Sequence, residues 1–208
     1  MIYVTVPGDT VSSISRQSGV PVWKIIYDNQ LGEEGELTVG QALLLLKPQE
    51  SAEIREDLYV TGYAYPFIEP YVLEMAFPAL NELLVFSYGF TFEGELVPPI
   101  QDETWMIQLA WENGIEPMLV LTPFTQGVFN NQLIQTLVEE ESVRENVITN
   151  LLKVVEEKGY VGVDVDFEYV RAQNREGYAE FVGELRAAMN EKGYRVSVAL
   201  APKTSSDQ

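Results

Sequence analysis

The chain has 208 residues, 46% of them apolar, which is enough for one medium-sized domain and one small domain. Its net charge of −19 at pH 7 disfavours nucleic acid and anionic membranes as partners, because both bind basic surfaces. Histidine and cysteine are absent, which excludes Ser-His-Asp and Cys-His catalysis, His- or Cys-bound zinc and disulfides. Any catalysis therefore rests on carboxylates, hydroxyls, amides, lysine or arginine, and we expect no cofactor and no bound metal.

The first residues carry no visible targeting signal. The segment 1–9 lacks the basic region and the long apolar region of a secretory signal peptide. No stretch reaches the roughly 18 apolar residues of a membrane span.

The first fifty residues predict the order strand, helix, helix, strand. Residues 2–6 alternate like a short strand and run into a Pro-Gly-Asp-Thr turn, whose Asp or Thr can cap a helix that Gly19 ends. A second helix is expected at 22–29, and the apolar run at 43–46 is expected to be the second strand.

Taken alone, the Pro-Gly-Asp-Thr turn would indicate only a turn with a helix cap. Five pieces together, in this order and spacing, resemble a LysM module: Val4-Thr-Val-Pro-Gly-Asp-Thr10, Ser13-Ile14, Gly19-Val20, Asn29-Gln-Leu31 and Val39-Gly-Gln-Ala-Leu43. The resemblance implies a small α+β (βααβ) domain at 1–48 that binds the N-acetylglucosamine backbone of peptidoglycan or chitin. It also implies a sugar groove lined by Gly8, Asp9, Thr10, Asn29, Gln30 and Leu31.

Residues 49–57 are charged and without periodicity, which predicts a linker to a second domain at 58–208. In that domain strands are expected at 58–65, 82–90, 117–123, 160–170 and 195–201. Helices are expected at 71–80, 102–114, 133–158 and 174–192, with a long loop at 125–131. Apolar strands that alternate with helices indicate a parallel α/β sheet, either open and doubly wound or closed as a (β/α)8 barrel. No Gly-x-Gly-x-x-Gly follows the first strand, which disfavours a nucleotide-binding sheet.

The stretch from Tyr160 to Val170 carries three acids at every second position. In an extended strand, Asp164, Asp166 and Glu168 point to one face, and neighbouring acids lie roughly 6.5–7 Å apart, close enough for coupled ionisation. In a barrel they would climb toward the carboxyl end of the strand, where active sites lie, with Glu168 at the rim.

Three interpretations of these acids compete. They could form a site for a hard cation, but the flanking residues read as strand and not as a calcium-binding loop. They could form the solvated face of an edge strand, but both flanks and the opposite face are apolar. The third interpretation is glycoside chemistry, in which one carboxylic acid protonates the leaving oxygen while neighbouring carboxylates set its charge.

The segment Val161-Gly-Val-Asp-Val-Asp-Phe-Glu168 is similar to the Asp-Gly-x-Asp-x-Asp-x-Glu signature of glycoside hydrolase family 18, with Val161 in place of the first Asp. Together with the LysM pieces, the chain resembles spore cortex-lytic N-acetylglucosaminidases. The resemblance implies that Glu168 is the general acid and base, that Asp166 holds the substrate acetamido group and that Asp164 tunes Asp166. It implies a substrate-assisted, retaining mechanism. Tyr63 and Tyr88 are candidate walls of a sugar site, and a core role for each is an alternative.

A closed barrel needs eight strands in roughly 250 residues, and the sequence predicts five strands after the linker. We therefore expect a (β/α)8 barrel of which about strands 1 to 5 are present, as in a fragment of a longer enzyme. The expected function is cleavage of β-linked N-acetylglucosamine in peptidoglycan, with the protein located at the spore coat, the cortex or the cell wall. The alternatives are a chitinase and a non-catalytic protein that binds peptidoglycan or chitin oligosaccharides.

Overall fold

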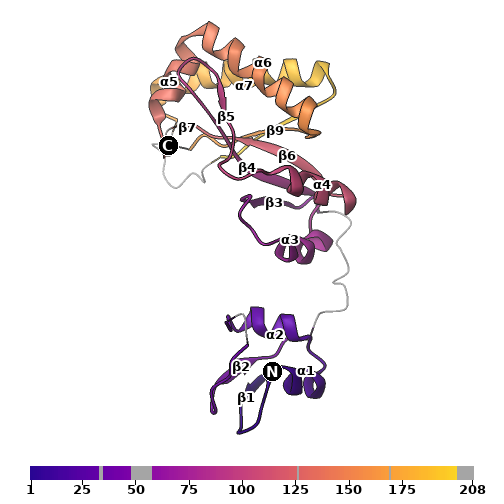
Figure 1. The fold of residues 1–208 in the computed structure, drawn as a ribbon. Coiled ribbons are helices and arrows are strands. Elements are labelled where there is room, and N and C mark those ends of the chain that lie inside the picture. The colour runs from indigo at the N-terminus through magenta and orange to yellow at the C-terminus, as the bar shows by residue number, and fades with distance from the viewer. Residues whose placement is uncertain (33–34, 48–57, 126, 169, 201–208) are drawn as a thin grey trace. The chain divides into compact units, whose positions relative to one another are not determined.

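The computed structural model describes residues 1–32, 35–47, 58–125, 127–168 and 170–200 (Figure 1). The chain divides into two compact units, Met1–Ile54 and Arg55–Gln208. The predicted linker at 49–57 lies outside the described residues. In the ranges given above, no helix combines the length and the apolar character needed to cross a membrane.

The first unit is a two-stranded antiparallel sheet covered by two helices. Its elements follow the order β1 (Ile2–Val4), α1 (Val11–Ser18), α2 (Val22–Asp28) and β2 (Ala42–Leu44). A buried apolar cluster lies between sheet and helices and contains Val11, Ile14, Val20, Ile25, Leu43 and Leu45. The expected second strand at 43–46 thus begins one residue earlier and ends at Leu44.

Helix α1 has a defined start and a defined end. The Thr10 side chain accepts a hydrogen bond from the Ser13 amide at 3.0 Å, and the Ser13 hydroxyl oxygen accepts one from the Thr10 amide at 3.0 Å. This reciprocal capping box satisfies two amides that the helix itself leaves unpaired. Gly19 ends the helix in the left-handed region, at φ 73°, which a residue without Cβ adopts at no steric cost.

The second unit alternates strands and helices as predicted. Its elements are β3 (Thr61–Ala64), α3 (Pro70–Ala76), β4 (Glu82–Phe90), β5 (Leu96–Val97), α4 (Thr104–Glu112), β6 (Glu116–Leu121), β7 (Phe124–Thr125), β8 (Val128–Phe129), α5 (Asn131–Glu139), α6 (Glu141–Lys158), β9 (Gly162–Val165), α7 (Arg175–Glu191) and β10 (Arg195–Val198). Short 3-10 turns lie at Phe77–Ala79 and Ala172–Asn174.

Five parallel strands lie side by side in the order in which the chain makes them, β3-β4-β6-β9-β10, and the short β5 pairs antiparallel with β4. A doubly wound sheet would reverse its strand order at a switch point. With right-handed crossovers, a sequential order places the connecting helices on a single face, and Figure 1 shows α5, α6 and α7 together over one side of the sheet. The arrangement is consistent with part of a (β/α)8 barrel.

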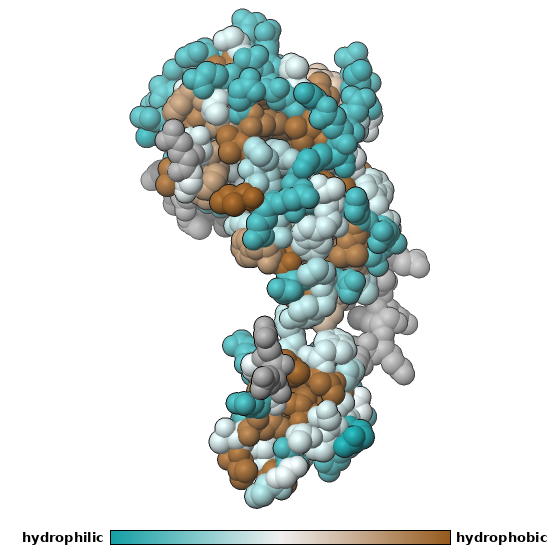
Figure 2. Space-filling model, in the orientation of Figure 1, coloured by the Kyte–Doolittle hydropathy of each residue, from teal (hydrophilic) through white to brown (hydrophobic). Residues whose placement is uncertain are grey.

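The two faces of the sheet carry separate apolar clusters. On the helix side, Leu83 and Val85 of β4 and Val163 and Val165 of β9 belong to the main core. Side chains at alternate positions, Leu84, Met118 and Val120, form a smaller buried cluster on the other face. Hydrophilic residues cover the outer surface of the helices, as Figure 2 shows at the top of the view.

Side chains of non-neighbouring strands meet across the helix-free face of the sheet, which shows that the sheet is strongly curved. Nη2 of Arg195 at the start of β10 lies 2.7 Å from carboxylate oxygens of Glu82 on β4 and Glu116 on β6. Glu82 and Arg195 belong to strands that are three positions apart, which is about 14 Å in a flat sheet with strands ~4.8 Å apart. The helix-free face is therefore concave.

Three predicted segments differ from the structure. The expected loop at 125–131 overlaps the antiparallel pair of β7 and β8, in which Phe124 lies opposite Phe129. The expected helical region at 133–158 is two helices that meet at Glu140. The expected strand at 160–170 is paired as a strand only at Gly162–Val165, so Asp166 and Glu168 lie beyond its end.

Candidate functional site

The three acids of the signature rise from the interior to the surface at the carboxyl end of β9. Asp164 lies inside the strand and is 2% exposed, Asp166 is half-buried just after it, and Glu168 is exposed. The alternation predicted from the sequence is retained, because Phe167 between them is buried in the helix-side core. The acids thus face away from the helices, with Glu168 at the outer edge.

Backbone pairing and ring packing fix the segment after β9. The Asp166 amide donates to the Leu121 carbonyl at 2.9 Å, which continues the pairing with β6 past the end of the strand. The Phe167 ring stacks against three rings, those of Phe90, Tyr178 and Phe181, at centroid distances of 5.9, 5.6 and 6.0 Å. Since Phe167 is held on the helix side, Asp166 and Glu168 are held on the opposite side.

Asp164 accepts hydrogen bonds from hydroxyls of two other strands. The Tyr63 hydroxyl of β3 donates to Oδ2 at 2.7 Å, and the Ser197 hydroxyl of β10 donates to Oδ1 at 2.6 Å. The sequence singled out Tyr63 but not Ser197, whose strand partner Asp164 becomes visible only in the register of β9 with β10. Both oxygens of this buried carboxylate are therefore satisfied.

Asp166 and Tyr63 both have a raised pKa in the site. Burial raises the pKa of the Asp166 carboxyl, and the negative charges of Glu168 and Asp164 raise it further. Burial also raises the pKa of Tyr63, and so does the hydrogen bond that its hydroxyl donates to Asp164. Tyr63 is therefore a neutral donor at neutral pH, and Asp166 holds a proton more readily than a free aspartate does.

A row of aromatic rings leads from the acids to solvent. Tyr63 meets Phe86 edge-on at 6.3 Å between centroids, Phe86 meets Tyr65 at 4.8 Å, and Tyr65 stacks on Phe67 at 4.9 Å. The exposed fractions are 50% for Tyr63, 48% for Tyr65 and 66% for Phe67, and Phe86 between the two tyrosines is half-buried. Tyr65 and Phe67 closely follow Tyr63 in the chain but were not among the predicted site residues.

Tyr88 is not part of a sugar wall, so this prediction is wrong. Its ring is 3% exposed in the helix-side core, and its hydroxyl donates to Glu103 at 2.5 Å. The pairing of β4 with β6 shifts register between Val85 and Tyr88, which turns the second half of β4 over. Tyr88 therefore points away from the concave face that Phe86 borders.

Two of the six residues expected to line the sugar groove of the first unit border a hollow in its surface. A hollow of about 290 Å³ is lined by Asp9, Thr10, Val11, Ser12, Val22, Ile26, Gly35, Glu36 and Leu37. It contains Asp9 and Thr10 of the expected set, with helix α2 and the segment 35–37 opposite them.

The remaining expected groove residues support the fold of the first unit. Asn29 donates from its side-chain amide to the carbonyls of Ile25 and Leu44 and accepts from the Leu44 amide at 2.6 Å. Leu31 packs against the apolar cluster of this unit, and Gln30 has a φ of 50°. Gly8, at φ 90°, allows the turn in which Asp9 accepts from the Tyr3 hydroxyl and the Val6 amide.

Across the residues that the structure describes, no group of three or more acidic side chains has an arrangement that could hold a metal ion.

Comparison with known proteins supports the resemblance drawn from the sequence. Residues 3–45 match the model of the LysM domain, and residues 127–208 match the model of glycosyl hydrolases family 18. The second match contains the three acids and Ser197. Over 134 residues the chain is 31% identical to the cortical fragment-lytic enzyme of Bacillus subtilis (strain 168), covering 64% of this chain and 30% of that protein.

Solved structures give the same picture. The spore cortex-lytic enzyme SleL of Bacillus megaterium QM B1551 superposes with a TM-score of 0.67 at 25% identity, covering 100% of this chain and 48% of SleL. A class V chitinase from Pseudomonas fluorescens Pf-5 shares the fold, with a TM-score of 0.66 at 21% identity over 71% of this chain and 46% of that protein. The chain thus spans less than half the length of these relatives.

Proposed function

We propose that this chain is the wall-binding and acid-bearing part of a glycosidase that cleaves β-linked N-acetylglucosamine in peptidoglycan, with spore cortex as its substrate and the cell wall or spore cortex as its location. The observation that carries the proposal is the row of three acids at the carboxyl edge of a parallel sheet, next to exposed aromatic rings. The family match over the same residues and the names of the relatives, which are cortex-lytic enzymes, support it.

In the proposed reaction Glu168 is the general acid. It is the exposed member of the row, so it is the carboxyl that can reach the glycosidic oxygen of a substrate bound at this edge of the sheet. Proton transfer from Glu168 breaks the bond to the leaving sugar, and the acetamido oxygen of the substrate attacks the anomeric carbon to give an oxazolinium ion. Glu168 then takes a proton from the water that opens this ion, and the configuration at the anomeric carbon is retained.

Asp166 and Asp164 have supporting roles in this proposal. Asp166 retains a proton more readily than a free aspartate, so it can donate a hydrogen bond to the acetamido group and orient it for attack. Asp164 is buried beneath it and acts through its charge. The half-exposed ring of Tyr63 would pack against the bound sugar, and Tyr65 and Phe67 would extend this surface.

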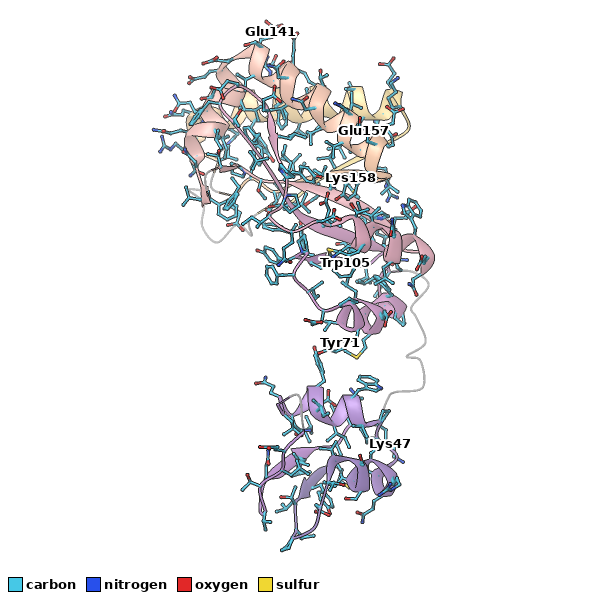
Figure 3. The ribbon with its side chains drawn as sticks, in the orientation of Figure 1. Lys47, Tyr71, Trp105, Glu141, Glu157 and Lys158 are labelled. Atoms are coloured by element: carbon cyan, nitrogen blue, oxygen red, sulfur yellow. The ribbon has the colours of Figure 1, made fainter. Side chains whose placement is uncertain are left out.

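The test is the substitution Glu168→Gln, which keeps the size of the side chain and removes the acid. We expect release of sugar from N-acetylglucosamine oligomers and cortex fragments to fall by a factor of about 10²–10⁴, with binding to insoluble peptidoglycan unchanged. Glu141→Gln at the start of α6 is the matched control, because Glu141 is exposed and outside the site (Figure 3). Equal release by wild type and Glu168→Gln would exclude Glu168 as the general acid, and no release by wild type would leave a non-catalytic wall-binding protein as the function.

The first unit would tether the enzyme to its polymer, which raises the local concentration of substrate. We propose that the glycan lies in the hollow between Asp9 and Thr10 and the segment 35–37. Titration of the labelled chain with N-acetylglucosamine oligomers should shift the amide signals of Thr10, Ser12 and Leu37 most. Shifts that spare these amides would place the glycan elsewhere.

A further inference from the structure

Asp164 is a buried carboxylate that is satisfied by hydroxyl groups alone. Its two oxygens accept hydrogen bonds from the Tyr63 hydroxyl at 2.7 Å and from the Ser197 hydroxyl at 2.6 Å. Among the ion pairs of the described residues, none involves Asp164. The two hydroxyls therefore supply the hydrogen bonds that a lysine or arginine supplies to other buried acids.

Ser197 reaches Asp164 directly from the neighbouring strand. The register places Ser197 of β10 on one side of Asp164 and Val120 of β6 on the other, and valine has no side-chain donor. Two residues before Ser197 on the same face, Arg195 is occupied by Glu82 and Glu116. Of the strand neighbours of Asp164, Ser197 alone supplies a side-chain proton to it.

We propose that Ser197 is a positioning residue of the acid row: its hydroxyl fixes the Asp164 carboxylate in the orientation in which the negative charge of Asp164 acts on Asp166. The proposal rests on the proposed function only for its catalytic consequence. A donor to a carboxylate favours its charged form, and a fixed negative charge disfavours ionisation of the next acid. Loss of the Ser197 hydroxyl would release one oxygen of this carboxylate, so that the charge of Asp164 would act less strongly on Asp166.

The other groups that interact electrostatically with Asp164 do not replace this role. Tyr63 of β3 donates to the second oxygen and stays neutral because its pKa is raised. Tyr178 of α7 also stays neutral, since burial and the two aspartates raise its pKa to about 12. The carboxylate of Glu82 on β4 is paired with Arg195. Asp166, whose pKa is raised by burial, Glu168 and Asp164, is thus the acid that responds to a change at Asp164.

The test is a carbon-detected NMR titration of the aspartate carboxyls in the full 208-residue chain. We expect Ser197→Ala to lower the proton affinity of Asp166 on the order of tenfold, since a hydrogen bond to the charged neighbour is lost. Ser197→Thr keeps a hydroxyl and should titrate like wild type. Ser87→Ala is the matched control, because the Ser87 hydroxyl bonds Thr122 and not the acids.

An Asp166 titration that is the same in Ser197→Ala and wild type would overturn the proposal, as would an equal shift in Ser87→Ala. If Ser197→Ala does not fold, Ser197→Thr and Ser197→Val provide a pair of nearly equal shape that differs in the hydroxyl, and the proposal requires Asp166 to titrate differently in the two. The titration needs no turnover, so it stands if Glu168→Gln shows the chain to be inactive. In an active protein, Ser197→Ala should also shift the pH profile of kcat with KM unchanged.

Discussion

The hydroxyl of Tyr63 on β3 donates a 2.7 Å hydrogen bond to Asp164 on β9, across the two strands that separate them. This bond connects the aromatic rings that begin at Tyr63 with the acid row, across the concave face of the sheet. Tyr63→Phe should lower the free energy of unfolding by about 1–3 kcal/mol, because a buried carboxylate oxygen loses its donor. Urea unfolding followed by circular dichroism measures this change.

Tyr65→Phe is the control for Tyr63→Phe, since Tyr65 is a neighbouring half-exposed tyrosine whose hydroxyl makes no hydrogen bond to the described residues. Its effect should stay within about 0.5 kcal/mol. Equal destabilisation by both substitutions would mean that the bond to Asp164 contributes nothing.

The pKa of Asp166 is raised by burial and by Glu168 and Asp164, so the Asp166 carboxyl destabilises the folded chain at pH values above the ordinary aspartate pKa. Asp166→Asn should therefore raise Tm at pH 7. The gain should shrink as pH falls and vanish below the ordinary aspartate pKa of about 3.9, where the carboxyl is protonated in both states. Thermal melts from pH 3 to 8 test this.

Asp102→Asn is a control for which the expected change in Tm at pH 7 has the opposite sign. Hydrogen bonds from the hydroxyl and amide of Thr104 lower the pKa of Asp102. Its ionised form therefore stabilises the fold above the ordinary aspartate pKa, and this contribution is lost as pH falls. Asp102→Asn should lower Tm at pH 7 and have no effect in acid; the same sign for both variants would contradict the assignment.

The Lys158 ammonium lies 2.6 Å from the Glu103 carboxylate, which is buried and also accepts from Tyr88. Lys158→Met should cost about 1–3 kcal/mol, because it leaves a buried acceptor without its charged donor. Lys153→Met on the same helix changes the net charge equally, but Lys153 is exposed, so its unfolding midpoint in urea should remain near that of wild type. Similar midpoints for the two variants would argue against the buried pair.

Two glycines of α7 predict opposite responses to alanine. At Gly183 an added Cβ meets no atom within 4 Å, so Gly183→Ala should stabilise the helix by about 0.5–1 kcal/mol. At Gly177 the Cβ would lie 2.7 Å from Cβ of Val138 on α5, so Gly177→Ala should destabilise by about 1–3 kcal/mol. The free energies of unfolding of the two variants test whether α5 and α7 pack so closely that a Cβ at residue 177 meets Val138.

Local pattern was enough to predict the alternation of strands and helices and the face on which Asp164, Asp166 and Glu168 lie. Apolar and polar residues repeat with the period of each element, and Gly19 ends its helix by a property of its own backbone. The burial of Phe167, which lies between Asp166 and Glu168 in the sequence, follows from the same alternation.

Features that depend on pairing between distant segments could not be predicted. The register shift in β4 that turns Tyr88 into the core arises from its pairing with β6 and leaves no mark in the alternation of β4 itself. Ser197 is an ordinary strand serine until its register with Asp164 is known. Asn29 lies in the expected sugar-binding segment, yet its side chain forms hydrogen bonds with the backbone of Leu44.

The hydrogen bonds of Asp164 also bear on how the chain folds. One donor lies 101 residues earlier in the sequence and the other 33 residues later. Contacts between such distant positions form slowly, because the intervening chain must be ordered first. We therefore expect the acid row to be completed late, after its last donor at residue 197 has left the ribosome. Until then one oxygen of Asp164 would lack its donor from β10.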